Sequence, residues 1–67
     1  MSELDQCRDA VKNHPEDDRA YLRLGEACFH EGKNEEALEA FQTAVRLRPE
    51  NAEAHFALGK IFDVFKR

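Results

Sequence analysis

The stretch from Leu24 to Pro49, LGEACFHEGKNEEALEAFQTAVRLRP, decides the fold. Its apolar residues recur three and four positions apart on both sides of Gly32, a spacing typical of two helices that each bury one face. Glycine tolerates a positive φ angle and proline lacks an amide hydrogen, so Gly32 ends the first helix and Pro49 ends the second. The stretch therefore predicts a helical hairpin.

Capping residues set the limits of this hairpin. We expect its first helix over residues 19–31, with Asp17 as the N-cap, because an aspartate side chain accepts hydrogen bonds from the free amides of the first turn. The second helix is expected over 35–47, with Asn34 as the N-cap and glutamates in the first turn, where the helix dipole favours negative charge. The link between the helices is short, so they pack antiparallel.

Two further helices flank the hairpin. Asn51 is expected to cap a helix over residues 52–65. Ahead of the hairpin, Ser2 with Asp5 three residues later resembles a capping box, and the apolar stripe of that early helix stops before Pro15. The chain is therefore predicted to be all-α, with four helices joined by short links.

An internal repeat relates these helices to one another. Pro15 and Pro49 lie 34 residues apart, and the same offset superposes small or apolar residues of the two halves. The matching pairs are Leu24–Gly25 with Leu58–Gly59, Ala20 with Ala54, Ala10–Val11 with Ala44–Val45, Cys7 with Phe41, and Cys28 with Phe62. A fixed period of this length is the signature of a stacked repeat architecture.

The repeated positions carry a resemblance to a known family. In chain order they are Tyr21, Leu24, Gly25, Gly32, Ala37, Phe41, Ala44 and Pro49, and this pattern is similar to the tetratricopeptide repeat (TPR). The resemblance implies a single domain over residues 1–67, built as a short right-handed solenoid of antiparallel helical hairpins. Residues 2–14 would be the second-type helix of a partial repeat, 16–49 one complete repeat, and 50–67 the first helix of a following repeat.

The resemblance also implies a function, because such repeats bind a peptide or protein partner on a concave face lined by the first helix of each pair. Helical geometry assigns to that face Arg19, Leu22, Arg23, Glu26, Phe29 and His30, followed by Glu53, Phe56, Ala57, Lys60 and Asp63. Arg19 and Arg23 lie one turn apart and could together take a carboxylate, as basic residues do in family members that bind the C-terminal carboxylate of heat-shock chaperones. Alternatively, both arginines are solvated and pair with Glu16, Glu26 or Glu53.

Length and charge exclude several classes of protein. With 67 residues, a formal net charge of -4 and two cysteines, the chain suits one small domain with free thiols in a reducing, cytoplasmic compartment. Residues 1–5 show no basic region followed by an apolar run, so no secretory signal is expected, and no apolar stretch approaches the roughly 18 residues of a membrane span. Lysines and arginines are scattered among carboxylates, which argues against nucleic acid as a partner.

We expect neither a metal site nor a catalytic thiol, and therefore no cofactor and no enzymatic activity. No pair among His14, His30, His55, Cys7 and Cys28 has the close spacing of a zinc site. Both cysteines fall on apolar helix faces, where a small buried hydrophobic side chain is the simpler interpretation. Nothing in the sequence places a base beside either thiol.

The last predicted helix carries an apolar stripe of Leu58, Ile61, Phe62 and Phe65, which in a longer stack a following helix would cover. Leaving such side chains in water forgoes about 1.5–3 kcal/mol each. One hypothesis is a structural assembly unit, a homo-oligomer in which this helix completes a repeat with another copy. The other is an adaptor for a protein or peptide partner, in which the stripe folds over or stays partly exposed.

Overall fold

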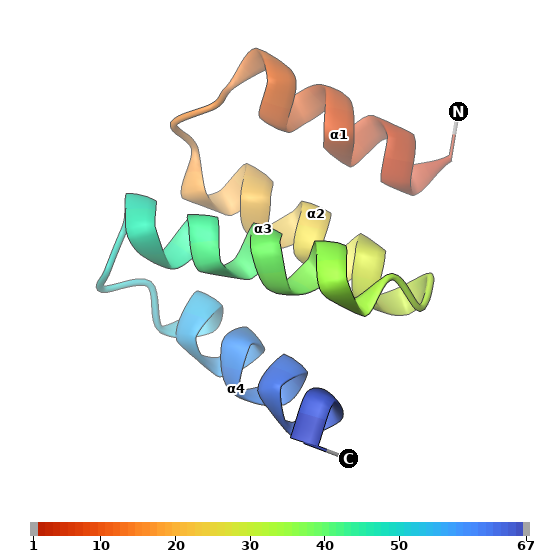
Figure 1. The fold of residues 1–67 in the computed structure, drawn as a ribbon. Helices are drawn as coiled ribbons and strands as arrows, with labels where there is room; N and C mark the ends of the chain where they lie inside the picture. The colour runs from red at the N-terminus through yellow and green to blue at the C-terminus, as the bar shows by residue number, and fades with distance from the viewer. Residues whose placement is uncertain (1, 67) are drawn as a thin grey trace.

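The structure consists of α-helices joined by short loops. The computed structural model describes residues 2–66, so Met1 and Arg67, the two ends of the predicted domain, lie outside the described residues. The helices are α1 (Glu3–Asn13), α2 (Asp18–His30), α3 (Asn34–Leu47) and α4 (Ala52–Lys66) (Figure 1). Residues 2–66 contain no strand, and the prediction of an all-α chain is confirmed.

Side-chain caps begin three of the helices as expected. The amide of Asp5 donates to Ser2 Oγ at 3.2 Å before α1, and the amide of Arg19 donates to Asp17 Oδ1 at 3.0 Å before α2. Asn51 caps α4, because its Oδ1 accepts from the amide of Ala54 at 3.1 Å. These contacts satisfy amides that the first turn of a helix leaves without a backbone partner.

The expected N-cap of α3 is wrong by one residue. α3 begins at Asn34 itself, and Lys33 occupies the capping position without a side-chain hydrogen bond. The cause is the tight loop before it: Gly32 adopts a φ of 80°, and the amide of Lys33 then donates to the carbonyl of Cys28 at 2.8 Å. This closure turns the chain early, so Asn34 is already helical.

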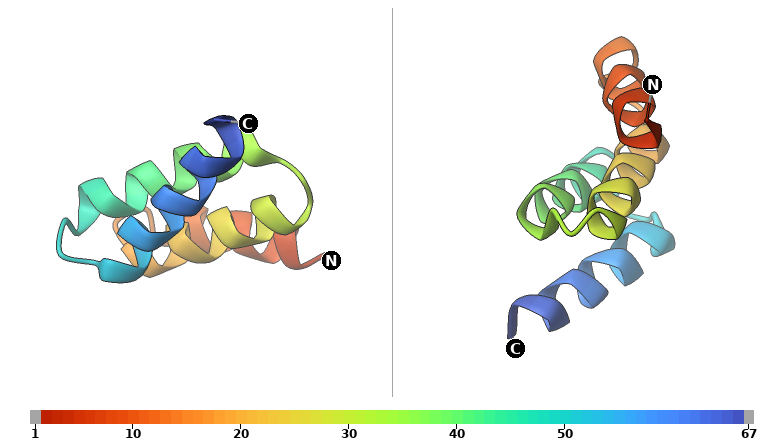
Figure 2. Two further views of the ribbon diagram at one scale, coloured as in Figure 1. Left: turned by 90° about the horizontal axis from the view of Figure 1, so that it is seen from below. Right: turned by 90° about the vertical axis from the view of Figure 1, so that its right-hand side faces the viewer.

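The helices stack in chain order. α1 lies at one end, the α2–α3 hairpin in the middle and α4 at the other end (Figures 1 and 2). α4 packs on α3 and also touches α2. The Cα atoms span 33 × 27 × 13 Å, and the shortest of these dimensions fits two helices packed about 8–10 Å apart. The stack is therefore thin, and each helix keeps one side in water.

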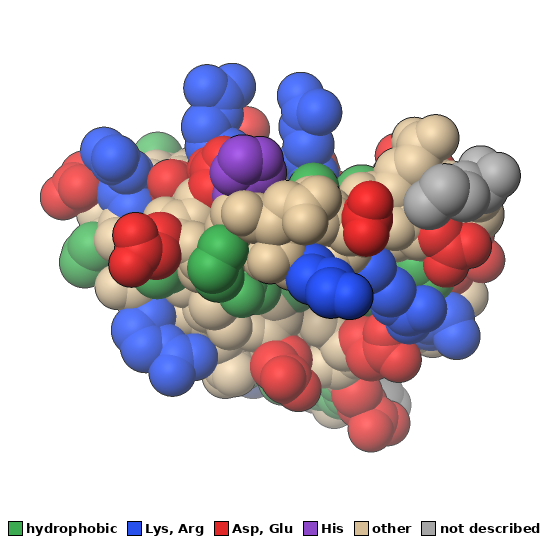
Figure 3. All heavy atoms as spheres, turned by 90° about the horizontal axis from the view of Figure 1, so that it is seen from above, with side chains coloured by type: hydrophobic (Ala, Val, Ile, Leu, Met, Phe, Trp, Pro, Cys, Tyr) green, Lys and Arg blue, Asp and Glu red, His purple; other side chains and the backbone are tan. Residues whose placement is uncertain are grey.

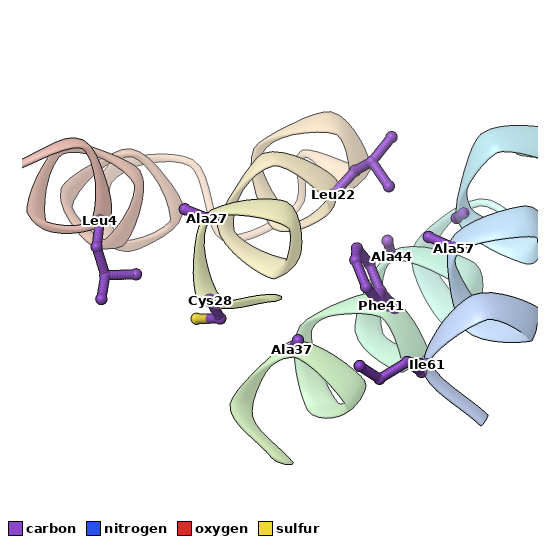
Figure 4. Packing of buried hydrophobic residues seen from close by; sticks show 10 residues of the cluster. Leu4, Leu22, Ala27, Cys28, Ala37, Phe41, Ala44, Ala57 and Ile61 are labelled. Atoms are coloured by element: carbon purple, nitrogen blue, oxygen red, sulfur yellow. The ribbon is translucent and has the colours of Figure 1, made fainter. Parts of the chain in front are cut away.

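The core forms one cluster that runs through all four helices (Figure 4). At the crossing of α2 and α3 the ring of Phe41 packs on the backbone of Gly25. A Cβ built at Gly25 would lie 2.6 Å from Phe41 Cδ1 and 2.9 Å from Cζ, closer than real Cβ contacts. Ala37, Ala44 and Cys28 are small residues buried in the same cluster. Small residues at this crossing therefore let the two helices approach closely.

α4 has two apolar faces, and only one of them lies inside. Ala54, Ala57 and Ile61 recur at helical spacing and are buried, and Ile61 lies beside Phe41 with 0% of its surface exposed (Figure 4). The expectation that Ile61 belongs to a self-association stripe is wrong, because residues of this chain enclose it. The rest of the stripe turns outward and is partly or largely exposed: Leu58, Phe62 and Phe65.

Candidate protein-binding groove

A groove runs between α2 and α4, the two helices that the repeat pattern makes equivalent. One part of it is a hollow of about 70 Å³. Its floor is apolar and its rim is charged or polar; the lining residues are Glu26, Phe29, His30, Phe41, Ala57, Lys60 and Ile61. A small apolar hollow with a few polar groups at its edge is the usual form of a site that takes one side chain of a partner.

A cation stands over two aromatic rings at this hollow. The Nζ of Lys60 lies 5.4 Å from the ring centroid of Phe56 and 5.9 Å from that of Phe29. Phe56 is 69% exposed, the most open of the large apolar side chains that the structure describes. Such cation–π contacts are worth about 0.5–1 kcal/mol at exposed sites. Lys60 and Phe29 line the hollow, and the two contacts place the Phe56 ring next to the same ammonium group.

Arg19 and Arg23 lie towards the other end of the groove. Both are exposed, and both line a wider hollow of about 730 Å³ between the first turns of α2 and α4. Within residues 2–66 neither arginine forms an ion pair, so the alternative pairing with Glu16, Glu26 or Glu53 is not observed. Carboxylates also line this hollow, which therefore carries both signs of charge.

Two residues assigned to the concave face are instead buried. Leu22 is 7% exposed and Ala57 is 5% exposed, and both belong to the core cluster. The reason is that α4 packs against the hairpin, so side chains that point from one of these helices towards the other are covered. Leu22 and Ala57 support the groove from below, whereas the other assigned positions on α2 and α4 keep surface that a partner can reach.

A buried carboxylate fixes the position of α4 relative to α2. Asp18, in the first turn of α2, is 8% exposed, and its Oδ2 accepts a 2.6 Å hydrogen bond from Asn51 Nδ2. Its Oδ1 lies 3.4 Å from Arg48 Nε. Because Asn51 is also the N-cap of α4, these contacts tie the start of α4 to the start of α2. They set the width of the groove at this end.

Sequence reasoning missed this contact, because Asp18 looks like ordinary first-turn charge beside the cap of α2. One signal was present. The 34-residue offset pairs Asp18 with Ala52, so a charge stands where the other copy has a methyl group. A buried carboxylate at such a position needs a partner, and the loop before α4 supplies it.

On the outer side of the stack, a charged contact joins α1 to α3. Arg8 Nη2 donates to Glu36 Oε2 at 2.8 Å, and this hydrogen bond holds the pKa of Glu36 below its ordinary value. The Sγ of Cys28 lies 3.7 Å from the same oxygen. Burial, with the nearby Glu36 charge as a second cause, raises the pKa of the Cys28 thiol. The cysteine is thus a core side chain kept as a neutral thiol.

Residues 2–66 contain neither a metal cluster nor a membrane-spanning helix. Among residues 2–66, no group of three or more His, Cys, Asp or Glu side chains could hold a metal ion. In the same part of the chain, no helix is both long and apolar enough to cross a membrane. Seen from the α1 side, lysines and arginines intermingle with carboxylates rather than gathering in one patch (Figure 3).

A stack of antiparallel helices repeating every 34 residues, with a groove between equivalent helices, defines an α-helical repeat module. The family model described as TPR repeat matches residues 25–62, more than half of the chain. The chain therefore belongs to the tetratricopeptide repeat family. Repeats of this family generally mediate contacts between proteins and are generally not catalytic.

Two curated proteins illustrate the relationship. The chain is 42% identical over 50 residues to small glutamine-rich tetratricopeptide repeat-containing protein 2 of Mycosarcoma maydis, a match that covers 75% of this chain and 14% of that protein. It is 43% identical over 49 residues to the protein O-mannosyl-transferase Tmtc3 of Drosophila melanogaster, covering 73% of this chain and 5% of that protein. The chain thus spans a small part of either relative. No solved structure gave a significant match.

Proposed function

We propose that the chain is a non-catalytic module that binds an extended protein segment in the groove between α2 and α4. The observation that carries this proposal is the position of Lys60 over Phe29 and Phe56, beside an apolar hollow that Lys60 and Phe29 line. The bound segment would place one apolar side chain in the hollow and a carboxylate near Lys60.

The basic residues further along the groove support an acidic partner segment. Arg19 and Arg23 are exposed, one turn apart, and form no ion pair within the described chain, so their guanidinium groups can take a carboxylate in a bidentate manner. The net charge of -4 would otherwise repel acidic peptides, so Arg19, Arg23 and Lys60 must supply the local attraction in the groove.

The proposal leaves the chain without a reaction of its own. The name of the Drosophila relative refers to a transferase, but the match covers 5% of that protein and does not carry the activity to this chain. The two free thiols suit the reducing, cytoplasmic compartment that the sequence indicates.

Fluorescence anisotropy with labelled short peptides tests the proposal directly. Three sets of peptides are compared, which share the same aliphatic residues and differ in whether the neighbouring residues are acidic, basic or neutral. Each peptide is made with a free and with an amidated C-terminus. We expect acidic peptides to bind best and to weaken as salt is raised, because the attraction is largely between charges. Equal binding of all three sets would contradict the proposal.

Charge reversal in the groove gives the matched test. Arg23→Glu should lower the affinity for the best-binding acidic peptide by at least about tenfold, since it turns an attraction into a repulsion inside the binding surface. Arg46→Glu makes the same change on the exposed surface of α3 and should leave the affinity within about twofold. If both variants bind the peptide as the unchanged chain does, the groove is not the binding surface.

A further inference from the structure

Glu26 lies at the junction of the hollows that make up the groove. It lines the small hollow of about 70 Å³ beside Lys60 and the wide hollow of about 730 Å³ beside Arg23. No other residue of the described chain lines both of them. A bound segment that occupies the two hollows must therefore pass over the Glu26 side chain.

The charge of Glu26 is opposite to that of the cations on either side of it. Arg19 and Arg23 precede it along α2 and line the wide hollow, whereas Lys60 of α4 lines the small one. The Glu26 side chain is exposed, and within residues 2–66 it forms no ion pair. Its carboxylate is therefore open to a bound segment, in the middle of a surface that otherwise attracts negative charge.

This carboxylate discriminates between segments by their charge at one position. A second carboxylate placed over Glu26 would be repelled by a like charge. A neutral apolar side chain placed there would take water from Glu26 without supplying a partner, which is also unfavourable. A positively charged side chain avoids both costs, and such a pair is worth more once a bound segment shields it from water.

Helical geometry gives the spacing that the partner needs. Glu26 follows Arg23 by three positions, about 4.5 Å at a rise of about 1.5 Å per residue. An extended segment advances about 3.3 Å per residue, so one or two residues of it cover this distance. His30, at the far edge of the small hollow, is four positions beyond Glu26, which corresponds to about two residues of the segment.

We propose that Glu26 is a specificity-determining residue of the groove and that the bound segment carries a lysine or arginine opposite it. This inference rests on the proposed function, because it assigns the order of charges in the segment that the groove binds. An acidic residue at Arg23 comes first, the basic residue at Glu26 next, and the apolar residue in the small hollow last. The partner is thus a segment of mixed charge in this order rather than a uniformly acidic one.

A lysine scan followed by fluorescence anisotropy tests the inference. The parent probe is a labelled peptide of about nine residues, longer than the groove requires, with one leucine among alternating aspartate and alanine. Lysine then replaces each position other than the leucine in turn. We expect lysine to weaken binding at most positions and to raise the affinity at least about threefold at one position close to the leucine. A scan in which lysine weakens binding at every position overturns the inference.

Two matched variants assign the lysine preference to a residue. Glu26→Gln removes the charge and keeps the size of the side chain, so the preferred position should no longer favour lysine. The same variant should bind the lysine-free parent peptide at least as tightly as the unchanged chain does, which also shows that it is folded. Glu39→Gln makes the same change in net charge on the exposed surface of α3 and should keep the preference. A preference that survives Glu26→Gln, or that disappears with Glu39→Gln, contradicts the role of Glu26.

Exchanging the two charges provides a direct test of contact. Glu26→Lys should lower the affinity for the preferred lysine peptide at least about threefold, and a glutamate at the same peptide position should restore binding to this variant. The two changes together should differ from the sum of their separate effects, because the side chains are in contact. Effects that simply add would refute the pairing.

The outcomes separate this inference from the proposed function. If neither the parent peptide nor any lysine peptide binds, the peptide-binding groove and the role of Glu26 both fail. If acidic peptides bind and Arg23→Glu weakens them, but lysine is favoured at no position, the groove stands and the role of Glu26 alone is refuted.

Discussion

The two equivalent glycines should respond to alanine with opposite signs. Gly25→Ala adds a methyl group that would lie 2.6 Å from Phe41 Cδ1 and 2.9 Å from Cζ, against a ring that is only 3% exposed. Overpacking of a core costs about 1–3 kcal/mol. Alanine regains about 0.5–1 kcal/mol of helix stability. The net effect of Gly25→Ala is therefore a loss of roughly 1 kcal/mol.

Gly59→Ala makes the same chemical change 34 residues later, where nothing lies within 4 Å. Only the helix-propensity gain remains, so the free energy of unfolding should rise by about 0.5–1 kcal/mol. Thermal unfolding of dilute chains, followed by circular dichroism, resolves these changes. In a domain of this size, 1 kcal/mol shifts the midpoint by roughly 4–8 °C.

A second substitution checks the cause of the loss at Gly25. Phe41→Leu removes the ring atoms that approach the added methyl group, so Gly25→Ala should cost less in that background than in the unchanged chain. The reasoning is refuted if Gly25→Ala is as stable as the unchanged chain, or if its cost is the same in both backgrounds. It also fails if Gly59→Ala is destabilised as much as Gly25→Ala.

Three further results are expected. Asn51→Asp should destabilise the chain, because the new carboxylate would face Asp18 Oδ2, which now accepts a hydrogen bond from Asn51 at 2.6 Å. Aspartate is as good an N-cap as asparagine, so loss of the cap would not explain the effect. Urea unfolding measures it, with Asn51→Ser, which caps without charge, as the control. The pKa of the Glu36 carboxyl is lowered in the folded chain. Its contribution to stability is therefore full above the ordinary pKa of 4.5 and is lost as the pH falls through the folded pKa. The difference in unfolding free energy between the unchanged chain and Glu36→Gln should shrink in acid, and a constant difference would contradict this. Burial raises the pKa of both thiols, but Cys28 is only 1% exposed whereas Cys7 is partly exposed, so Cys7 should react with a thiol reagent well before Cys28. Equal rates under native conditions would show that the core is open.

The fold was largely predictable from local patterns. Apolar spacing on both sides of Gly32 indicated the α2–α3 hairpin, and the 34-residue offset related it to the flanking helices. Side-chain caps at Ser2, Asp17 and Asn51 were correct because capping depends on a few neighbouring residues. The cap of α3 was misplaced because a loop closure, rather than a side chain, begins that helix.

The candidate groove was predictable only in part. Helical geometry assigned Phe29, Phe56 and Lys60 to one surface, and the structure brings their side chains together. Helical geometry could not show that Leu22 is covered, because periodicity groups residues into faces without saying which face another helix will meet. The hollow itself depends on how α4 crosses the hairpin, and no local pattern encodes that crossing.

The sequence by itself determined the helices, the repeat and the small residues at the crossing of α2 and α3, since these follow from short-range spacing. Only the tertiary structure decided that Ile61 lies inside while Phe62 lies outside, and that Asp18 is a buried link rather than surface charge. α4 is apolar on two sides, and packing on α3 covers one of them. Which side is covered depends on contacts between residues far apart in the chain.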